Sequence, residues 1–170
     1  MLGHYENFPE TLHHKEAFTS FQSRIGLQQT LAQVLLEVNR VTFSFEKIAI
    51  PTVPNSTVMF EWGIADDGCF TSIGEEEEKR IREVTAKEPL QVMDFFCAIR
   101  YYKNVAGKKS PLKFDYYMVR VFFAENRRVE FHIFHERGPR YLSPADLVLF
   151  LVTKVNGTST KRLLKSAETD

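Results

Sequence analysis

The sequence from residue 114 to residue 142, FDYYMVRVFFAENRRVEFHIFHERGPRYL, decides the fold. Its first part alternates in the manner of a β-strand, with Tyr117 and Val121 on one face and Met118 and Phe122 on the other. Both faces are nearly apolar, which is typical of a central strand that is covered on both sides. The stretch therefore predicts a strand at the centre of a sheet.

The same stretch continues through a polar turn at residues 125–127 into a second alternating segment, residues 129–136. Two strands joined by a short turn form a hairpin. Ser143 and Pro144 then have the residue types preferred at the N-cap and the first position of a helix, and Gly157 is typical of a helix end. We therefore expect an antiparallel hairpin followed by a helix.

The N-terminal part of the chain shows two different periods. Apolar residues recur at steps of three and four over residues 11–38, which predicts a long helix, in one piece or divided at Gly26. The period then changes to two, which predicts strands over residues 41–46 and 58–64. The sequence DDG that follows is a hairpin turn signal leading into a short third strand at residues 69–72.

The middle of the chain predicts two helices. Ser72 and Glu75 have the spacing of a capping box, and the acidic run that follows suits the positive end of a helix dipole. Pro89 predicts the start of a second helix, with an apolar stripe over residues 90–101. Residues 103–110 are expected to form a basic loop.

These expectations give the element order α-β-β-β-α-α-β-β-α. This order predicts an α+β fold, in which an antiparallel sheet of about five strands has helices packed on it. We expect residues 1–157 to form a single domain and residues 158–170 to form a polar C-terminal tail. The element order resembles that of the type III secretion chaperone-like fold, and this resemblance implies a small dimeric binding protein.

The composition is that of a globular protein. Of the 170 residues, 44% are apolar and 26% are charged, a balance that argues against intrinsic disorder. The two cysteines have no metal or redox spacing. The chain shows neither the start of a signal peptide nor an apolar run long enough for a membrane helix. We therefore expect a cytoplasmic protein with no cofactor, no metal and no membrane contact.

Charge is unevenly distributed, although the net charge is zero. Residues 1–100 carry 9 Lys and Arg against 15 Asp and Glu, whereas residues 101–170 carry 13 against 7. Such a difference indicates either solvated faces of opposite sign or an electrostatic contact with a partner. Basic side chains neutralise phosphates and exposed aromatic rings stack on bases, so nucleic-acid binding by the C-terminal half is one hypothesis.

A set of basic and aromatic residues supplies the candidate binding side chains. They are Arg127, Arg128, Phe134, Arg137, Arg140 and Tyr141. Arg137 and Arg140, next to the start of the last predicted helix, are also placed to hold an anion. The pI near 7 and the lack of a known RNA-binding sequence motif weigh against nucleic acid as the main partner.

Glu130, His132 and Glu136 are candidate catalytic residues, because alternation would place them on one face of the second strand of the hairpin. A carboxylate beside an imidazole can form a general base. The alternative is a solvated strand face with ordinary cross-strand pairs. His132 and His135 would point to opposite faces of a strand, so we expect no shared metal ion. No phosphate-binding or nucleophile-elbow motif accompanies them.

The leading hypothesis is a non-enzymatic protein-binding or self-associating module. The chain contains 15 phenylalanines and 6 tyrosines, and its central strand is apolar on both faces. One layer of helices would cover only one of these faces. An apolar face left over would mark a surface for a protein partner or for a second copy of the chain. A nucleic-acid-binding domain and an enzyme remain the alternatives.

Overall fold

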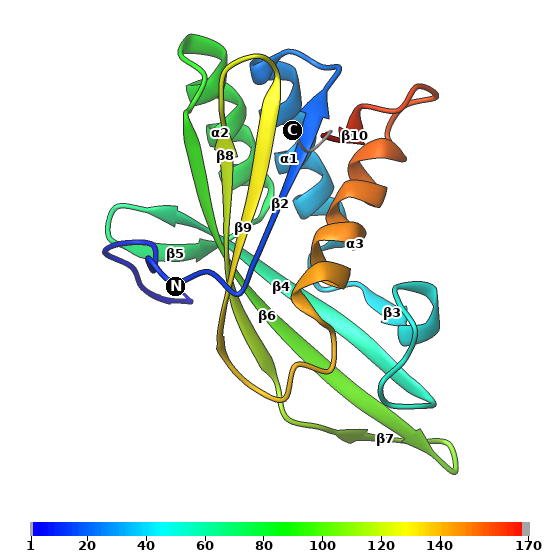
Figure 1. Cartoon of the computed structure of the whole chain (residues 1–170). Helices are drawn as coiled ribbons and strands as arrows, with labels where there is room; N and C mark the ends of the chain where they lie inside the picture. The colour runs from blue at the N-terminus through cyan, green and yellow to red at the C-terminus, as the bar shows by residue number, and fades with distance from the viewer. Residues whose placement is uncertain (1, 168–170) are drawn as a thin grey trace.

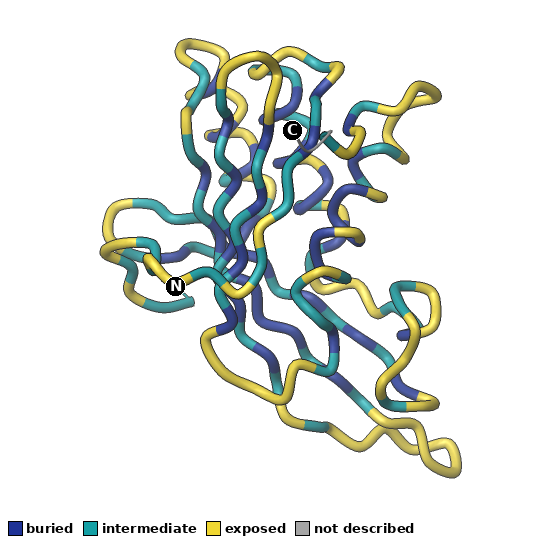
Figure 2. Tube along the Cα trace, viewed as in Figure 1, coloured by how far each residue is buried: buried dark blue, intermediate teal, exposed yellow. Residues whose placement is uncertain are grey.

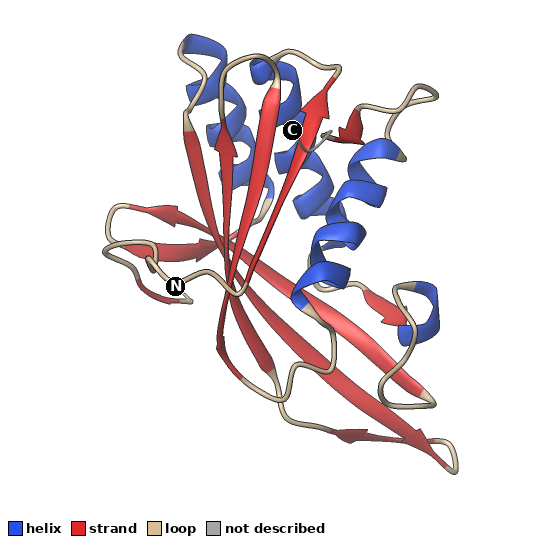
Figure 3. Ribbon diagram, viewed as in Figure 1, coloured by secondary structure: helices blue, strands red, loops and turns tan. Residues whose placement is uncertain are grey.

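The computed structural model describes residues 2–167, which form a ten-stranded antiparallel sheet with three α-helices on one side (Figures 1 and 3). The strands are β1 (Gly3–His4), β2 (His14–Ser20), β3 (Thr42–Ser44), β4 (Ser56–Asp66), β5 (Cys69–Ser72), β6 (Val92–Val105), β7 (Lys108–Pro111), β8 (Asp115–Phe123), β9 (Arg128–Arg137) and β10 (Leu164–Ser166). The helices are α1 (Arg24–Val38), α2 (Glu75–Lys87) and α3 (Pro144–Asn156), with a 3-10 turn η1 (Phe45–Lys47).

The sheet is built mainly from hairpins. Its strand order is β1-β5-β4-β6-β8-β9-β2-β10, with β3 beside β4 and β7 beside β6. The predicted hairpin at the centre is confirmed as β8 and β9, and β6 lies on the other side of β8. The long strand β6 therefore links the two halves of the sheet.

The core lies between the sheet and the helices, where Figure 2 shows the buried residues. Alternate residues of the central strands, such as Tyr117 and Val119 of β8, are fully buried on this side. Phe150 of α3 stacks on Phe60 of β4, with ring centroids 4.6 Å apart. Large aromatic rings thus fill much of the space between the two layers.

Several predicted elements are confirmed. The hairpin of β4 and β5 turns at Asp67 and Gly68, both with positive φ, as the DDG signal predicts. The last helix begins where its sequence predicts, because the Oγ of Ser143 accepts a hydrogen bond from the Asp146 N–H at 3.1 Å.

The long helix predicted over residues 11–38 is wrong in its first part. Residues 14–20 form β2, which pairs with β9, and only α1 is helical. Phe18 and Ser20 face the core while Ala17 and Thr19 lie on the other face, which is the alternation of a strand. The apolar steps of three and four therefore combined residues of a strand with residues of a helix.

The helix predicted over residues 90–101 is also wrong, because residues 92–101 belong to β6. Met93, Phe95, Cys97 and Ile99 are buried and point to the core. Nearly every residue here is apolar, so helical and strand periods both fit it, and pairing with β4 and β8 decides for a strand.

The predicted start of one helix and the predicted end of the folded region are also wrong. The capping box predicted at Ser72 does not form, because α2 begins after Gly74, whose N–H donates to the carboxylate of Glu77 at 3.3 Å. The segment expected to be a polar tail contributes β10, in which Leu164 is buried against the core. The last three residues of that predicted tail, 168–170, lie outside the described residues.

The predicted mixture of helices and antiparallel sheet is thus confirmed, whereas the number of strands and the element order are wrong. The resemblance to the type III secretion chaperone-like fold rested on that order, so the structure removes its basis. Both cysteines are free, and Cys97 is buried in the core. No helix among the described residues is long and apolar enough to cross a membrane.

Candidate functional site: the helix-free face of the sheet

Within residues 2–167, no helix lies on one face of the sheet. Alternation along β6, β8 and β9 turns every second side chain toward this helix-free face, while the side chains between them enter the core. The central residues of the face are Phe96 and Arg100 of β6, Tyr116 and Arg120 of β8, and His132 and Phe134 of β9. All six are partly exposed, so the face combines apolar and charged groups within reach of solvent.

Aromatic rings run across the helix-free face in one row. The ring centroids of Phe70 and Phe96 are 5.6 Å apart, and those of Phe96 and Tyr116 are 5.9 Å apart. Phe114 continues the row at 6.1 Å from Tyr116. These distances are typical of offset or tilted aromatic pairs. The row joins residues from both halves of the chain, so it exists only in the folded protein.

A groove of about 370 Å³ follows this aromatic row. Two arginines line it with different partners. The Nη2 of Arg100 lies 3.1 Å from a carboxylate oxygen of Glu61. The guanidinium carbon of Arg137 lies 4.2 Å from the ring centroid of Tyr116, and this guanidinium forms no ion pair within the described chain. The groove therefore offers stacked rings and an arginine that no carboxylate of the described chain neutralises.

The N-terminal segment, residues 2–13, crosses the helix-free face beside the groove. The Tyr5 hydroxyl donates to the carboxylate of Asp94, and the guanidinium carbon of Arg120 lies 4.8 Å from the ring centroid of Phe8. Burial and the bond to Asp94 raise the pKa of Tyr5 well above its ordinary value. Leu2 packs over Gly63, where a Cβ would approach the Leu2 side chain to 2.6 Å. The chain itself thus covers part of this face.

The last residue of the N-terminal segment is fixed by two contacts. The ring of His13 stacks on Phe134 with centroids 4.9 Å apart, and its Nδ1 accepts a hydrogen bond from the His135 N–H at 2.8 Å. Desolvation and the charge of Arg140 lower the pKa of His13. A neutral imidazole is required for this acceptor role, so the shift and the geometry agree.

Of the three candidate catalytic residues, the structure brings two together. Glu130 lies 3.0 Å from the Nε2 of His132, and its carboxylate also pairs with Arg128 at 3.0 Å and Lys15 at 3.3 Å. These partners lower the pKa of Glu130 to about 2, with His132 making the largest contribution. The carboxylate is thereby held as an anion, which weakens it as a general base.

Glu136 does not join this pair. It lies next to a register shift between β8 and β9 and lines the groove beside Arg137. Six residues along an extended strand separate it from Glu130, about 20 Å at the usual rise. The three residues therefore do not form one catalytic cluster.

Arg140 and Tyr141, both predicted to bind a partner, take part in a buried polar network around Asp115. The side chain of Asp115 is fully buried and accepts four hydrogen bonds. Two come from the side chains of Tyr101 and His135, at 2.6 and 2.9 Å, and two from the backbone N–H groups of Arg140 and Tyr141, at 2.7 and 3.0 Å. Burial and the bond to Asp115 raise the pKa of Tyr101 well above its ordinary value. The network fixes the connection between β9 and α3.

The side chain of Arg140 is also committed, because its Nε donates to the Nδ1 of His135 at 3.1 Å. His132 and His135 point to opposite faces of β9, as the alternation predicts. Within residues 2–167, no group of three or more His, Cys, Asp or Glu side chains is arranged to hold a metal ion.

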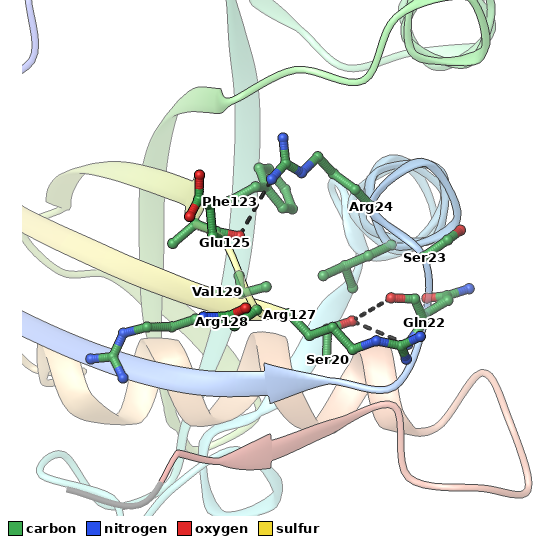
Figure 4. Close-up of a pocket in the computed structure, with 12 residues that line it drawn as sticks. Ser20, Gln22, Ser23, Arg24, Phe123, Glu125, Arg127, Arg128 and Val129 are labelled. Atoms are coloured by element: carbon green, nitrogen blue, oxygen red, sulfur yellow. Dashed lines mark hydrogen bonds between the residues drawn. The ribbon is translucent and has the colours of Figure 1, made fainter. Parts of the chain in front are cut away.

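Arg127 and Arg128 lie at the turn between β8 and β9, next to a cavity of about 230 Å³ at the start of α1 (Figure 4). The Nη2 of Arg24 reaches across this cavity and donates to the backbone carbonyl of Ala124 at 3.3 Å. The side chain of Arg128 points away from Arg24 toward Glu130. The predicted basic and aromatic residues are therefore divided among three places: this turn, the helix-free face with Phe134 and Arg137, and the Asp115 network.

Sequence reasoning missed most of the groove. It assigned Phe96 and Arg100 to a helix, so their place beside Tyr116 was hidden. The acidic partner of Arg120, Asp94, lay in the same segment; the two form a double hydrogen bond at 2.7 and 3.0 Å. The sequence carries no clear signal for either, because nearly every residue from 93 to 101 is apolar and fits a helical period as well as a strand period.

Comparisons of the chain with known protein families, with curated proteins and with solved structures found no significant match.

Proposed function

We propose that the protein is a non-enzymatic binding module that holds a protein partner against the helix-free face of its sheet. The observation that carries this proposal is the row of aromatic rings along an open groove, with the guanidinium of Arg137 stacked on Tyr116.

The composition of the groove supports a protein partner. The centres of protein interfaces are enriched in tyrosine, phenylalanine, methionine and arginine, and depleted in lysine, glutamate and aspartate. Phe96, Tyr116, Met118, Arg100 and Arg137 line the groove; among the described residues no lysine or aspartate does, and Glu61 and Glu136 lie at its edge with the arginines. Tyrosine and arginine are also the residue types that most often dominate binding energy.

The N-terminal segment indicates which shape of partner the face accepts. It lies on the sheet as irregular chain, with only Gly3–His4 in a strand, and contacts the face through Tyr5 and Phe8, three residues apart. We therefore propose that the partner presents a non-helical segment with an aromatic side chain, which enters the groove beside Tyr116. An acidic group near that side chain would pair with Arg137.

Selection of short random peptides by display on the immobilised protein tests the proposal. We expect enriched peptides to carry aromatic residues and to bind the Tyr116→Ala and Arg137→Ala variants about tenfold more weakly, the effect of losing ~1.4 kcal/mol of binding energy.

Arg127→Ala is the matched control, because it removes an exposed arginine at the distant β8–β9 turn. Peptides that bind all variants equally, or a selection that enriches nothing, would contradict the proposal. Light scattering over a range of concentrations shows whether the partner is a second copy of the chain or a different protein. A dimer that Tyr116→Ala dissociates identifies a second copy of the chain as the partner.

A further inference from the structure

The hairpin of β6 and β7 extends beyond the rest of the sheet (Figure 1) and is exposed along its length (Figure 2). Lys103 is the last residue of β6 that pairs with β4, and it also pairs with Ser110 of β7. From there to Ala106 at the turn the chain advances three residues, about 10 Å at the usual rise. We name residues 103–111 the β6–β7 ribbon.

The β6–β7 ribbon and the loop after it are strongly basic. Lys103, Lys108, Lys109 and Lys113 are exposed, and no acidic residue occurs in the sequence between Asp94 and Asp115. None of these lysines forms an ion pair with any described residue. Arg127, Lys161, Arg162 and Lys165 at the other end of the described chain form no ion pair either, so what distinguishes the ribbon is its projecting two-stranded shape.

The lysines lie on both faces of the ribbon. The register pairs Asn104 with Lys109 and Val105 with Lys108. Alternation then places Lys103 and Lys108 on one face and Lys109 on the other. A flat acidic protein surface would contact only one of these faces. A partner with negative charge on two facing walls would contact both.

The major groove of B-form DNA has this arrangement of charge, because a phosphate backbone runs along each of its edges. It is about 12 Å wide and about 8.5 Å deep, and it admits a two-stranded β-ribbon. Two strands about 4.8 Å apart fit this width. The β6–β7 ribbon, about 10 Å long, fits the depth.

The tip of the ribbon is small and has a defined conformation. Ala106 and Gly107 both have positive φ, as in the two-residue turns that match the twist of paired strands. A Cβ on Gly107 would meet nothing within 4 Å, so the tip is unobstructed. Val105 beside it is 53% exposed. The tip can therefore approach the base edges while the lysines behind it meet phosphates.

The second basic region of the chain lies at the opposite end of the molecule (Figure 1), at the β8–β9 turn and the loop before β10. Arg128 in that region is paired with Glu130. The two regions do not form one continuous basic track. We therefore propose that the β6–β7 ribbon by itself binds double-stranded DNA, with its tip in the major groove.

Fluorescence anisotropy with a labelled DNA duplex of mixed sequence, in increasing NaCl, tests this proposal. If the three lysines of the ribbon and Lys113 just after it each neutralise one phosphate, the slope of log K against log salt is about −3.6, and affinity falls about 150-fold between 50 and 200 mM salt. The triple variant Lys103→Ala, Lys108→Ala, Lys109→Ala should reduce the slope to about −0.9.

The matched control removes three charges from the opposite end, in Lys161→Ala, Arg162→Ala, Lys165→Ala. It should keep the slope of the unmodified protein. An equal loss in both triple variants would show that only the total charge acts, and would overturn the proposal. Circular dichroism and the melting temperature establish that both variants are folded.

Three further probes identify the partner. Duplex RNA, whose major groove is too narrow and deep for such a ribbon, should bind more weakly than duplex DNA. Single-stranded DNA or a polyglutamate peptide that binds as tightly as duplex DNA would overturn the proposal in favour of another anion. Tyr116→Ala should leave duplex binding unchanged, so failure of this proposal and failure of the proposed groove are distinguishable.

Discussion

Gly138, in the connection between β9 and α3, has no room for a side chain. Its φ is +117°, and a Cβ there would lie 2.3 Å from the carbonyl oxygen of Phe114 and 2.4 Å from a carboxylate oxygen of Asp115. Both contacts are far below van der Waals distance, and the neighbours are a backbone group and a buried carboxylate with four hydrogen bonds. Only glycine fits this position.

We predict that Gly138→Ala lowers the free energy of unfolding by at least about 3 kcal/mol, because the left-handed backbone and the clash both oppose it. Gly107→Ala is the control: its φ is also positive, at +77°, but the surrounding space is open. Its cost should stay near 1 kcal/mol. Urea unfolding followed by the fluorescence of Trp62, which is fully buried, measures both. Equal costs would show that backbone conformation, and not the close contact, requires glycine at position 138.

Glu130 makes the fold less stable as the pH becomes acidic. Its pKa falls from 4.5 to about 2 in the folded protein, so the folded state favours the carboxylate. The stabilisation, at most about 3 kcal/mol, is present above pH 4.5 and is lost as the pH falls toward 2.

We predict that Glu130→Gln is less stable than the unmodified protein at pH 7, and that the difference disappears as the pH approaches 2. Urea midpoints at a series of pH values measure this convergence. Glu125→Gln, an exposed position without an ion pair in the described chain, should give no such change. A constant difference between Glu130→Gln and the unmodified protein at all pH values would contradict the argument.

At the scale of elements, the sequence predicts those whose signals are local. The β8–β9 hairpin, the DDG turn and α3 follow from alternation, turn residues and a cap, each read within a few neighbours. The strands β2 and β6 were predicted as helices, because their apolar residues also fit a period of three or four. Pairing with strands remote in the sequence decided these cases, and such pairing is not visible in a single sequence.

The candidate site was predictable to a similar extent. The strands β8 and β9 supply Tyr116, Phe134 and Arg137, and alternation correctly separates His132 from His135. The half of the groove that β5 and β6 supply required the sheet topology. The buried role of Asp115 was missed because a charged residue at a strand end usually faces solvent, whereas four donors converge on it here.

The strand β10 is attached to the rest of the molecule by one side chain in particular. The Oδ1 of Asn156 accepts hydrogen bonds from the N–H groups of Leu163 and Leu164 at 3.0 and 2.8 Å, and its Nδ2 donates to the Leu164 carbonyl at 3.1 Å. Each bond contributes about 1 kcal/mol. Asn156 therefore joins the end of α3 to the start of an edge strand.

We predict that Asn156→Ala loosens β10 locally and leaves the remainder of the fold intact. Amide exchange of β10, measured by NMR, should accelerate about tenfold or more, since ~1.4 kcal/mol corresponds to a factor of ten. Amides of β8 should keep their exchange rates. Lys161→Ala, an exposed substitution in the same loop, serves as the control. Unchanged exchange in β10 would show that burial of Leu164 alone holds this strand.

At the scale of the whole molecule, the two faces of the sheet are covered by unlike structures. Three helices cover one face, whereas the N-terminal segment crosses the other and leaves the groove open. This segment is held by few groups: β1 pairs with β5 over two residues, and Tyr5 and Phe8 contact the face through their side chains. The cover on the helix-free face should therefore be far easier to remove than the helical one.

We predict that a variant lacking residues 1–12 remains folded, binds a hydrophobic dye and self-associates, because Phe96, Met118 and neighbouring rings lose their partial cover. Light scattering over a range of concentrations measures the association, and circular dichroism reports the fold. Glu6→Gln with Glu10→Gln is the control, since it keeps the segment and removes only exposed charges.

If the shortened chain stays monomeric and dye-free, the segment contributes little cover, and the helix-free face is too polar to act as an apolar contact surface. If it associates, adding Tyr116→Ala should restore the monomer, because the same aromatic row then forms the contact.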